Sequence, residues 1–236
     1  MKLSQMKSSS SILIDLKDIT KTFGTGELEQ SVLSDLSLTI RDGETVAITG
    51  QSGSGKSTLL SILGLLESPS SGEYKLRGFP INNISYTQLA EIRNKHLGWV
   101  FQNFSLINSL TALQNVALPL RFNASISSSE YESLSKEALA KVGLEQKRDL
   151  YPEQLSGGQQ QRIAIARALV SKPAVILADE PTGNLDKENS DNVIELLLSQ
   201  ANSGTTLILV THNVDYAKLC NKVYTIRNGV LSNVEQ

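Results

Sequence analysis

An eight-residue segment has the composition of a phosphate-binding loop. It reads Gly-Gln-Ser-Gly-Ser-Gly-Lys-Ser over residues 50–57 and fits the pattern G-x-x-x-x-G-K-[ST]. Glycines let the backbone curl so that successive N–H groups point at an anion, and a helix after the loop adds its positive end. Lys56 can reach the β- and γ-phosphates of a nucleotide, and the Ser57 hydroxyl can ligate Mg²⁺. The candidate nucleotide ligands here are Gly50, Ser52, Gly53, Ser54, Gly55, Lys56, Ser57 and Thr58.

The non-functional interpretation of this segment is an ordinary glycine turn that exposes a lysine. The surroundings favour the phosphate loop instead, because the apolar run Val46-Ala47-Ile48 precedes it and residues 57–66 have a helical pattern.

Two carboxylates follow an apolar run in the last third of the chain. Residues 174–178 are Ala-Val-Ile-Leu-Ala, and Asp179 and Glu180 come directly after them. At the end of a strand, Asp179 is placed to bind the Mg²⁺ shell. Side-chain direction alternates along a strand, so Glu180 points elsewhere and can hold or deprotonate an attacking water. Alone, the two residues would suggest a strand-end acidic pair capped by Pro181; the phosphate loop favours the catalytic interpretation.

A second anion-binding geometry is predicted at residues 155–159, Leu-Ser-Gly-Gly-Gln, which open a helical pattern. Such a helix start exposes free N–H groups at the positive end of the helix dipole. One ATP has one phosphate tail, and the first loop already binds it. The second motif therefore suggests that two copies of the chain face each other and complete each other's sites.

The elements that must position these motifs alternate between strand and helix. Residues 174–178 and 206–210 are continuous apolar runs, as expected for strands covered on both faces, and residues 191–201 between them have a helical period. This succession predicts an α/β fold with parallel strands. Further strands are predicted at 12–16, 37–40 and 72–77, and further helices at 86–94, 130–142 and 156–170.

Composition narrows the class of protein. The 236 residues carry a net charge of −2, which argues against a nucleic-acid partner bound through bulk charge, and the single cysteine excludes a disulfide framework. Residues 1–11 lack the apolar core of a signal peptide and are expected to form a flexible tail. Residues 97–120 carry no charge, yet their five amides make them unfit to span a bilayer, so we expect a soluble chain in a reducing compartment.

The two glycine motifs and the acidic pair together resemble the nucleotide-binding domain of ABC transporters, and the resemblance extends over residues 12–231. It implies a P-loop NTPase core with a mostly parallel sheet and a small antiparallel β sub-domain. It also implies a helical sub-domain inserted at roughly residues 103–160, with the whole ATPase domain spanning residues 12–236.

The resemblance also assigns roles to positions that are uninformative alone. Phe23 lies where the family stacks an aromatic on adenine, although it could be an ordinary core or surface aromatic. Gln102 matches the glutamine at the join of the sub-domains, Asp186 lies in a loop that touches the opposite subunit, and His212 matches a histidine that senses the γ-phosphate. The implied cofactors are ATP and Mg²⁺. The implied catalytic set is Glu180, Lys56, His212 and Gln102, the metal ligands are Ser57, Gln102 and Asp179, and further ATP contacts come from Phe23, Ser156, Gly157, Gly158, Gln159 and Asp186.

Residues 93–102, 110–120 and 177–186 look like one branch of the family, the LolD/MacB group of lipoprotein-release and macrolide- or peptide-export ATPases. Two features depart from that branch. Asn213 follows His212 where an aspartate is usual, and residues 1–11 have no counterpart.

The branch implies a homodimer that forms around two ATP and drives a separate membrane permease from the cytoplasmic face of the membrane. The permease is expected to dock near residues 102–120, with the apolar side chains there either lining a groove or forming sub-domain core. These candidates are Phe104, Leu106, Ile107, Leu110 and Leu113. A second function stays open, an ATPase that signals through a permease-like partner as in the cell-division pair FtsE/FtsX. A soluble repair or translation ATPase would need a second fused domain or a coiled-coil insertion.

Overall fold

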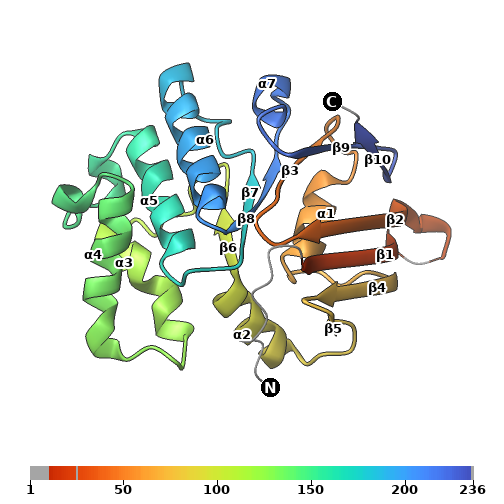
Figure 1. Cartoon of the computed structure of the whole chain (residues 1–236), viewed down its shortest axis with the longest axis horizontal. Coiled ribbons are helices and arrows are strands. Elements are labelled where there is room, and N and C mark those ends of the chain that lie inside the picture. Colours follow the sequence, from red (N-terminus) through yellow and green to blue (C-terminus); the bar gives the residue numbers. More distant parts are fainter. Residues whose placement is uncertain (1–10, 25, 235–236) are drawn as a thin grey trace.

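The computed structural model describes residues 11–24 and 26–234, and it contains two β-sheets flanked by helices (Figure 1). The smaller sheet is antiparallel, in the order β2-β1-β4-β5, and the larger has the order β10-β9-β3-β8-β7-β6. The predicted tail, apart from Ser11, lies outside the described residues. The strands are β1 (Ile12–Phe23), β2 (Gln30–Arg41), β3 (Thr45–Thr49), β4 (Ser71–Leu76), β5 (Phe79–Pro80), β6 (Leu97–Val100), β7 (Val175–Asp179), β8 (Thr206–Val210), β9 (Lys222–Arg227) and β10 (Val230–Val234).

Two cores lie on opposite faces of the larger sheet. Along β7, Ile176 and Ala178 pack with helices α5 and α6, whereas Val175 and Leu177 pack with helix α1 and the antiparallel sheet. All four are fully buried, which explains why this strand is a continuous apolar run rather than an alternating one. The helices are α1 (Lys56–Leu63), α2 (Tyr86–His96), α3 (Ala112–Ala117), α4 (Tyr131–Lys141), α5 (Gly157–Leu169), α6 (Lys187–Asn202) and α7 (Val214–Ala217).

The predicted α/β class is confirmed, because β6, β7, β8, β3 and β9 run parallel to one another in the larger sheet, while β10 pairs antiparallel with β9. The helix predicted over residues 57–66 is shorter than expected. It ends at Leu63, where Gly64 caps it, and Leu65 turns the chain with a φ of 57°. Strands β6, β9 and β10 were not predicted, since Leu97–Val100 is only four residues long and contains a glycine and the other two carry mixed polar sequences.

The region around residues 103–160 contains α3 and α4, which pack against α5 at the left of Figure 1. One buried amide organises it. Asn115 is fully buried, accepts a hydrogen bond from the Ile107 N–H at 2.8 Å and donates to the carbonyls of Ile107 and Leu110 at 3.1 and 3.0 Å. The amide content of this uncharged stretch therefore serves in part to fold its own backbone.

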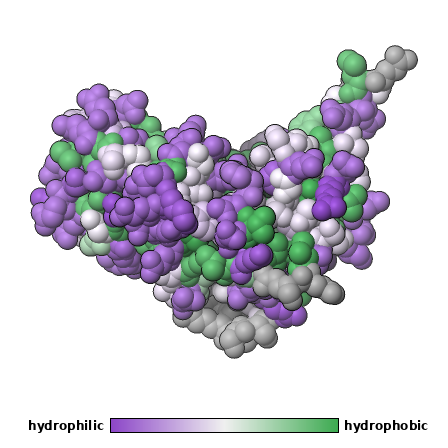
Figure 2. Space-filling view, turned by 90° about the horizontal axis from the view of Figure 1, so that it is seen from above, coloured by the Kyte–Doolittle hydropathy of each residue, from purple (hydrophilic) through white to green (hydrophobic). Residues whose placement is uncertain are grey.

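On the face shown in Figure 2, hydrophilic residues predominate, and a broad notch separates the helical region at the left from the antiparallel sheet at the right. Within the described part of the chain, none of the helices combines the length and apolar character required to cross a bilayer.

Candidate active site

Most of the residues predicted to do chemistry line one cavity of about 550 Å³. It lies where the loop after β3 meets the ends of β6, β7 and β8, which are the carboxyl ends of parallel strands and the usual place for a ligand in such sheets. The lining residues are Val32, Gly50, Ser52, Gly53, Gly55, Lys56, Ser57, Thr58, Gln102, Asp179, Glu180 and His212.

The loop requires glycine at two positions for steric reasons. Gly50 has a φ of 148°, and a side-chain carbon there would lie 2.5 Å from the carbonyl oxygen of Ile226. Gly55 has a φ of 106°, and the same carbon would lie 2.8 Å from Cδ2 of Leu33. The loop therefore packs closely against β2 and β9 and enters α1 directly, with Gly55 as the helix N-cap.

Lys56, the first residue of α1, turns its ammonium group back onto this loop. Its Nζ donates to the carbonyl oxygens of Gly50 and Gln51, both at 2.8 Å. An ammonium has three donors, so one remains for an anion in the cavity. The loop backbone thus fixes the position of the charge that would meet a phosphate.

Asp179 ends β7 at the wall of the cavity. Burial and the neighbouring charge of Glu180 raise the pKa of its carboxyl, while Lys56 opposes that shift. Ser57 and Gln102 line the same cavity, so one partly buried carboxylate, a hydroxyl and an amide face it together. These are hard oxygen ligands of the kind that Mg²⁺ accepts when substrate phosphates supply the rest of its shell.

Glu180 leaves the strand in a left-handed conformation, with a φ of 44°, and its N–H donates to the carbonyl of Val210 at 3.0 Å. A non-glycine residue in this region is strained by about 1–3 kcal/mol, a cost that is found at functional sites. Its Oε2 lies 2.9 Å from Nδ1 of His212, and the His212 N–H donates to the same oxygen at 3.4 Å. The bend therefore places the carboxylate at the end of β8, in contact with His212.

Asn213, the departure from the usual aspartate, preserves the local backbone. Its Oδ1 accepts hydrogen bonds from the N–H groups of Asp215 and Tyr216 at 2.9 and 3.2 Å and so caps α7. An asparagine caps a helix as well as an aspartate does. The substitution removes a negative charge next to His212 without removing the cap.

The second anion-binding motif does not line this cavity. Ser156 caps α5, and its side chain accepts from the Gln159 N–H at 3.4 Å. The start of α5 contacts the start of α6 through Asn189, because a side-chain carbon at Gly158 would lie 2.2 Å from Oδ1 of Asn189. Asp186 caps α6, accepting from the N–H and Nδ2 of Asn189 at 2.9 and 2.7 Å.

Phe23 is also not among the residues that line the nucleotide cavity. It is 44% exposed at the end of β1, and Nζ of Lys21 lies 4.9 Å from its ring centroid. Lys21 is itself held by Glu67 at 2.7 Å, so one face of the ring is occupied by a fixed cation. The sequence patterns did not single out Lys21, Val32 or Asn189; of these only Asn189 has a local signal, its N-cap spacing from Asp186.

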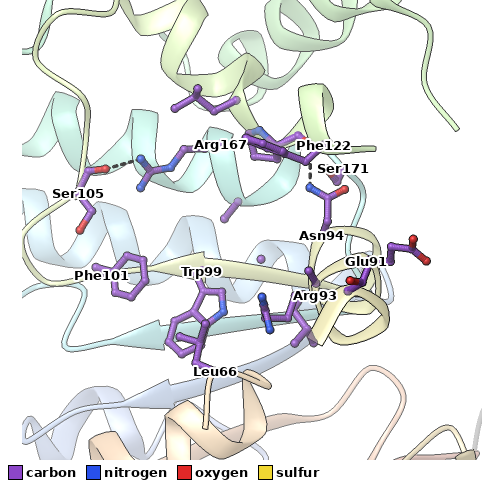
Figure 3. A pocket seen from close by; sticks show the side chains of 17 residues that line it. Leu66, Glu91, Arg93, Asn94, Trp99, Phe101, Ser105, Phe122, Arg167 and Ser171 are labelled. Atoms are coloured by element: carbon purple, nitrogen blue, oxygen red, sulfur yellow. Dashed lines mark hydrogen bonds between the residues drawn. The ribbon is translucent and has the colours of Figure 1, made fainter. Parts of the chain in front are cut away.

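A second cavity, of about 600 Å³, lies between α2, β6, the 3₁₀ turn Leu118–Phe122 and α5 (Figure 3). It is lined by Trp99, Phe101 and Ser105 but by none of the five apolar residues suggested from the sequence. Leu106 and Leu113 instead pack against the core that contains α5 and α6, and Ile107 is 44% exposed.

A family profile, curated relatives and solved structures all match this chain to ABC transporter ATP-binding proteins. Residues 33–183 match the profile of the ABC transporter family. The chain is 46% identical to the ABC transporter ATP-binding protein YbbA of Escherichia coli K12 over 93% of this chain and 96% of YbbA. It is 44% identical to the lipoprotein-releasing system ATP-binding protein LolD of Psychrobacter arcticus over 94% of this chain and 99% of LolD.

Against the macrolide export ATP-binding/permease protein MacB of Chlorobaculum tepidum, the identity is 45% over 93% of this chain, which spans 33% of MacB. Among solved structures, the dimeric bacterial ABC transporter cassette MJ0796 superposes with a TM-score of 0.85 at 40% identity, covering 95% of this chain and all of that one. A dimeric post-hydrolysis state of the same cassette, bound to ADP and Pi, also has a TM-score of 0.85.

Proposed function

The chain belongs to the ABC transporter family of ATPases, and from that membership we propose that two copies hydrolyse two shared ATP molecules to drive a membrane permease of the lipoprotein-release or macrolide/peptide-export type. The observation that carries the proposal is the 550 Å³ cavity, in which the phosphate loop, Asp179 and the Glu180–His212 pair face one another. Few other chemistries need a phosphate cradle, a metal-binding carboxylate and a second carboxylate beside it.

The residues that line the cavity divide the work of binding and hydrolysis among them. The loop N–H groups and Lys56 bind the phosphates and offset their charge. Ser57, Asp179 and Gln102 would hold Mg²⁺, which when bound supplies a Lewis acid for the phosphoryl oxygens. Glu180 orients the attacking water or accepts its proton, and His212 positions Glu180 and contacts the γ-phosphate. Phe23, which does not line the cavity, would stack its free face on the adenine.

Pairing of two copies would add what one cavity lacks. The motif at Ser156–Gln159 opens helix α5, as an anion-binding helix start would, but does not line the cavity of its own chain. Placed against the cavity of a partner copy, it would make ATP the shared ligand of two surfaces. The dimeric state of MJ0796 supports this arrangement. Loss of the γ-phosphate contacts on hydrolysis would then separate the copies.

The permease is proposed to dock in the second cavity, next to residues 102–120, and to hold the chain at the cytoplasmic face of the membrane. Supporting this, the MacB relatives are named ATP-binding/permease proteins, and this chain matches only a third of their length. The cavity is also continuous with the segment that follows Gln102, so that a partner seated there would touch residues adjacent to the nucleotide.

The experiment that tests this proposal measures ATP hydrolysis and the oligomeric state of the chain together. Phosphate release from ATP with Mg²⁺ is measured per chain at increasing protein concentration, together with the mass in solution by light scattering. We expect the rate per chain to rise as the pair becomes populated and then to level off. A rate per chain that does not change while the mass changes from one copy to two would contradict shared sites, and absence of phosphate release at every concentration would contradict the activity.

A further inference from the structure

The second cavity has an aromatic and aliphatic wall with an open mouth. Trp99 and Phe101 stack with their ring centroids 5.1 Å apart and their planes 11° apart. Leu66 and Phe122 stand at the rim, 56% and 75% exposed. Figure 3 shows these side chains around one cavity: Trp99 comes from β6, Phe101 from just after it, Leu66 from the loop after α1 and Phe122 from the 3₁₀ turn Leu118–Phe122. Such a wall suits the apolar face of a short helix.

Two arginines lie among these apolar residues, and both use their charge only on backbone oxygens. Arg167 of α5 donates to the carbonyl of Ser105 at 2.5 Å and to that of Phe104 at 2.8 Å. Arg93 of α2 donates to the carbonyl of Leu65 at 2.8 Å. Among the described residues neither forms an ion pair with a carboxylate. A guanidinium has five donors, so each arginine retains several.

For Arg167, partial burial of the guanidinium carries a desolvation cost. Burial lowers the pKa of its guanidinium, and no opposing carboxylate compensates the loss of hydration. Buried charges are usually paired, and an unpaired one is stabilised when an opposite charge arrives.

The other polar atoms of the cavity increase the excess of donors. Within the described part of the chain, Nε1 of Trp99 and Oγ of Ser171 are buried and have no hydrogen-bond partner. The one acidic residue on the wall is Glu91, which is exposed on α2. An acceptor with negative charge therefore finds several complementary groups here, whereas a cation would meet two like charges.

We propose that the segment of the membrane permease that docks in this cavity carries an aspartate or glutamate, flanked by apolar residues, and that Arg93 and Arg167 bind this carboxylate. The inference rests on the proposed function, because it specifies the chemistry of the partner at that docking site. A carboxylate bound by Arg167 would also be connected to the nucleotide cavity through residues 102–105. Phe104 and Ser105, which Arg167 holds, have φ angles of 60° and 50°, and they follow closely after Gln102, a residue of the nucleotide cavity.

The first experiment locates the partner. The photo-crosslinker p-benzoylphenylalanine replaces Phe122 in the full chain, expressed in cells together with the membrane proteins of its source, and for comparison replaces Val230 of β10, exposed at the far edge of the sheet. We expect a multi-span membrane protein to be captured from position 122 and not from position 230. Failure to capture one from position 122 would overturn the docking part of the proposed function and this inference with it.

The second experiment tests the carboxylate alone. In Arg93→Lys and Arg167→Lys variants, a carbodiimide joins the introduced amine to any carboxylate in contact with it, and mass spectrometry maps the bond. An isopeptide bond to an aspartate or glutamate of the captured membrane protein is expected from at least one variant. Capture from position 122 with no such bond from either variant would overturn the inference and leave docking intact.

An Arg93→Gln variant gives an independent measure that does not disturb the turn held by Arg167. We expect the partner recovered with the chain to fall at least about tenfold, as when one member of a buried charge pair is truncated. Phosphate release by the isolated chain should stay unchanged, which also shows that the variant is folded. The matched control is Lys95→Gln, an exposed residue of the same helix. Equal recovery from the two variants would contradict the role of Arg93.

Discussion

Nδ1 of His212 lies 2.9 Å from Oε2 of Glu180, so the exposed end of β8 holds the carboxylate that follows β7. The histidine side chain is 75% exposed and that of the glutamate 17% exposed. The ring is therefore the more exposed partner of the contact, and both side chains line the cavity. This contact couples two adjacent strands at the point where hydrolysis would occur.

Replacing Glu180 with glutamine should separate nucleotide binding from turnover. The amide keeps the shape of the side chain but cannot accept a proton from water, and loss of a general base costs about 10²–10⁴-fold in rate. We expect ATP affinity within about twofold of the native chain, phosphate release reduced at least about 100-fold and a paired species that accumulates with ATP. Binding is measured with a fluorescent ATP analogue and pairing by gel filtration.

The control for this variant is Glu188→Gln, an exposed residue in the first turn of α6 that does not line the cavity. It should hydrolyse ATP at the native rate. Near-normal hydrolysis by Glu180→Gln would show that another group activates the water.

Alanine at Gly158 should destabilise the chain, whereas alanine at Gly157 should not. A methyl group at Gly158 would lie 2.2 Å from Oδ1 of Asn189, whose Nδ2 is fixed on Asp186 at 2.7 Å, so the clash breaks the contact between α5 and α6. At Gly157 the nearest atom is Cδ2 of Leu185 at 3.6 Å, an ordinary contact.

Overpacking costs about 1–3 kcal/mol, while alanine in place of a helical glycine otherwise gains about 0.5–1 kcal/mol. Urea unfolding of the isolated chain therefore distinguishes the two variants, with a lower midpoint for Gly158→Ala and an equal or higher one for Gly157→Ala. Equal destabilisation of both would mean that the α5–α6 contact does not explain the second glycine.

The motifs could be predicted from the sequence because their chemistry is local. Lys56, Asp179 and the parallel strands beside them follow from spacing and apolar runs, and the structure brings Lys56, Asp179, Glu180, Gln102 and His212 to one cavity. Contacts between residues that are far apart in the chain leave no pattern in the sequence and could not be predicted. Arg167 holds Phe104 from 63 positions away, and Lys21 meets Glu67 across 46 positions. For the same reason the sequence left open whether the apolar residues after Gln102 line a groove or form core, and the structure packs Leu106 and Leu113 against the core.

Removing the ring of Phe23 should weaken binding of the base and leave binding of phosphate unchanged. The ring is backed by Lys21 on one face and is 44% exposed, which leaves a surface for stacking. Stacking of a base on an aromatic side chain contributes about 1–3 kcal/mol, or about 5- to 150-fold in affinity. We expect Phe23→Ala to lower ATP affinity by that factor while inorganic tripolyphosphate binds as before. Tyr86→Ala, which removes an exposed aromatic from α2, is the control, and equal loss for both ligands would refute stacking.

Replacing Asp179 with asparagine should stabilise the nucleotide-free chain at neutral pH and weaken its Mg²⁺-dependent binding of ATP. Burial and the charge of Glu180 raise the pKa of Asp179 in the folded chain above its ordinary value of 3.8. A raised pKa means that the folded state favours the protonated form. The contribution to the free energy of unfolding is then fully present below the ordinary pKa and is lost as the pH rises through the higher, folded-state pKa. Asparagine stays neutral, so the variant retains that contribution at pH 7.

The thermal midpoint of Asp179→Asn should therefore exceed that of the native chain at pH 7, and the difference should shrink as the pH falls toward 3.8. Asp191→Asn provides a control of opposite sign. The hydrogen bond from Tyr216 at 2.8 Å and the ammonium of Lys187 lower the pKa of Asp191, so its removal should lower the midpoint at pH 7, again with a difference that shrinks on acidification. Only Asp179→Asn should weaken Mg²⁺-dependent ATP binding, by at least about tenfold, because only Asp179 faces the cavity. A lower midpoint for Asp179→Asn at pH 7 would contradict the raised pKa of its carboxyl, and unchanged Mg²⁺-dependent ATP binding would contradict the metal-ligand role.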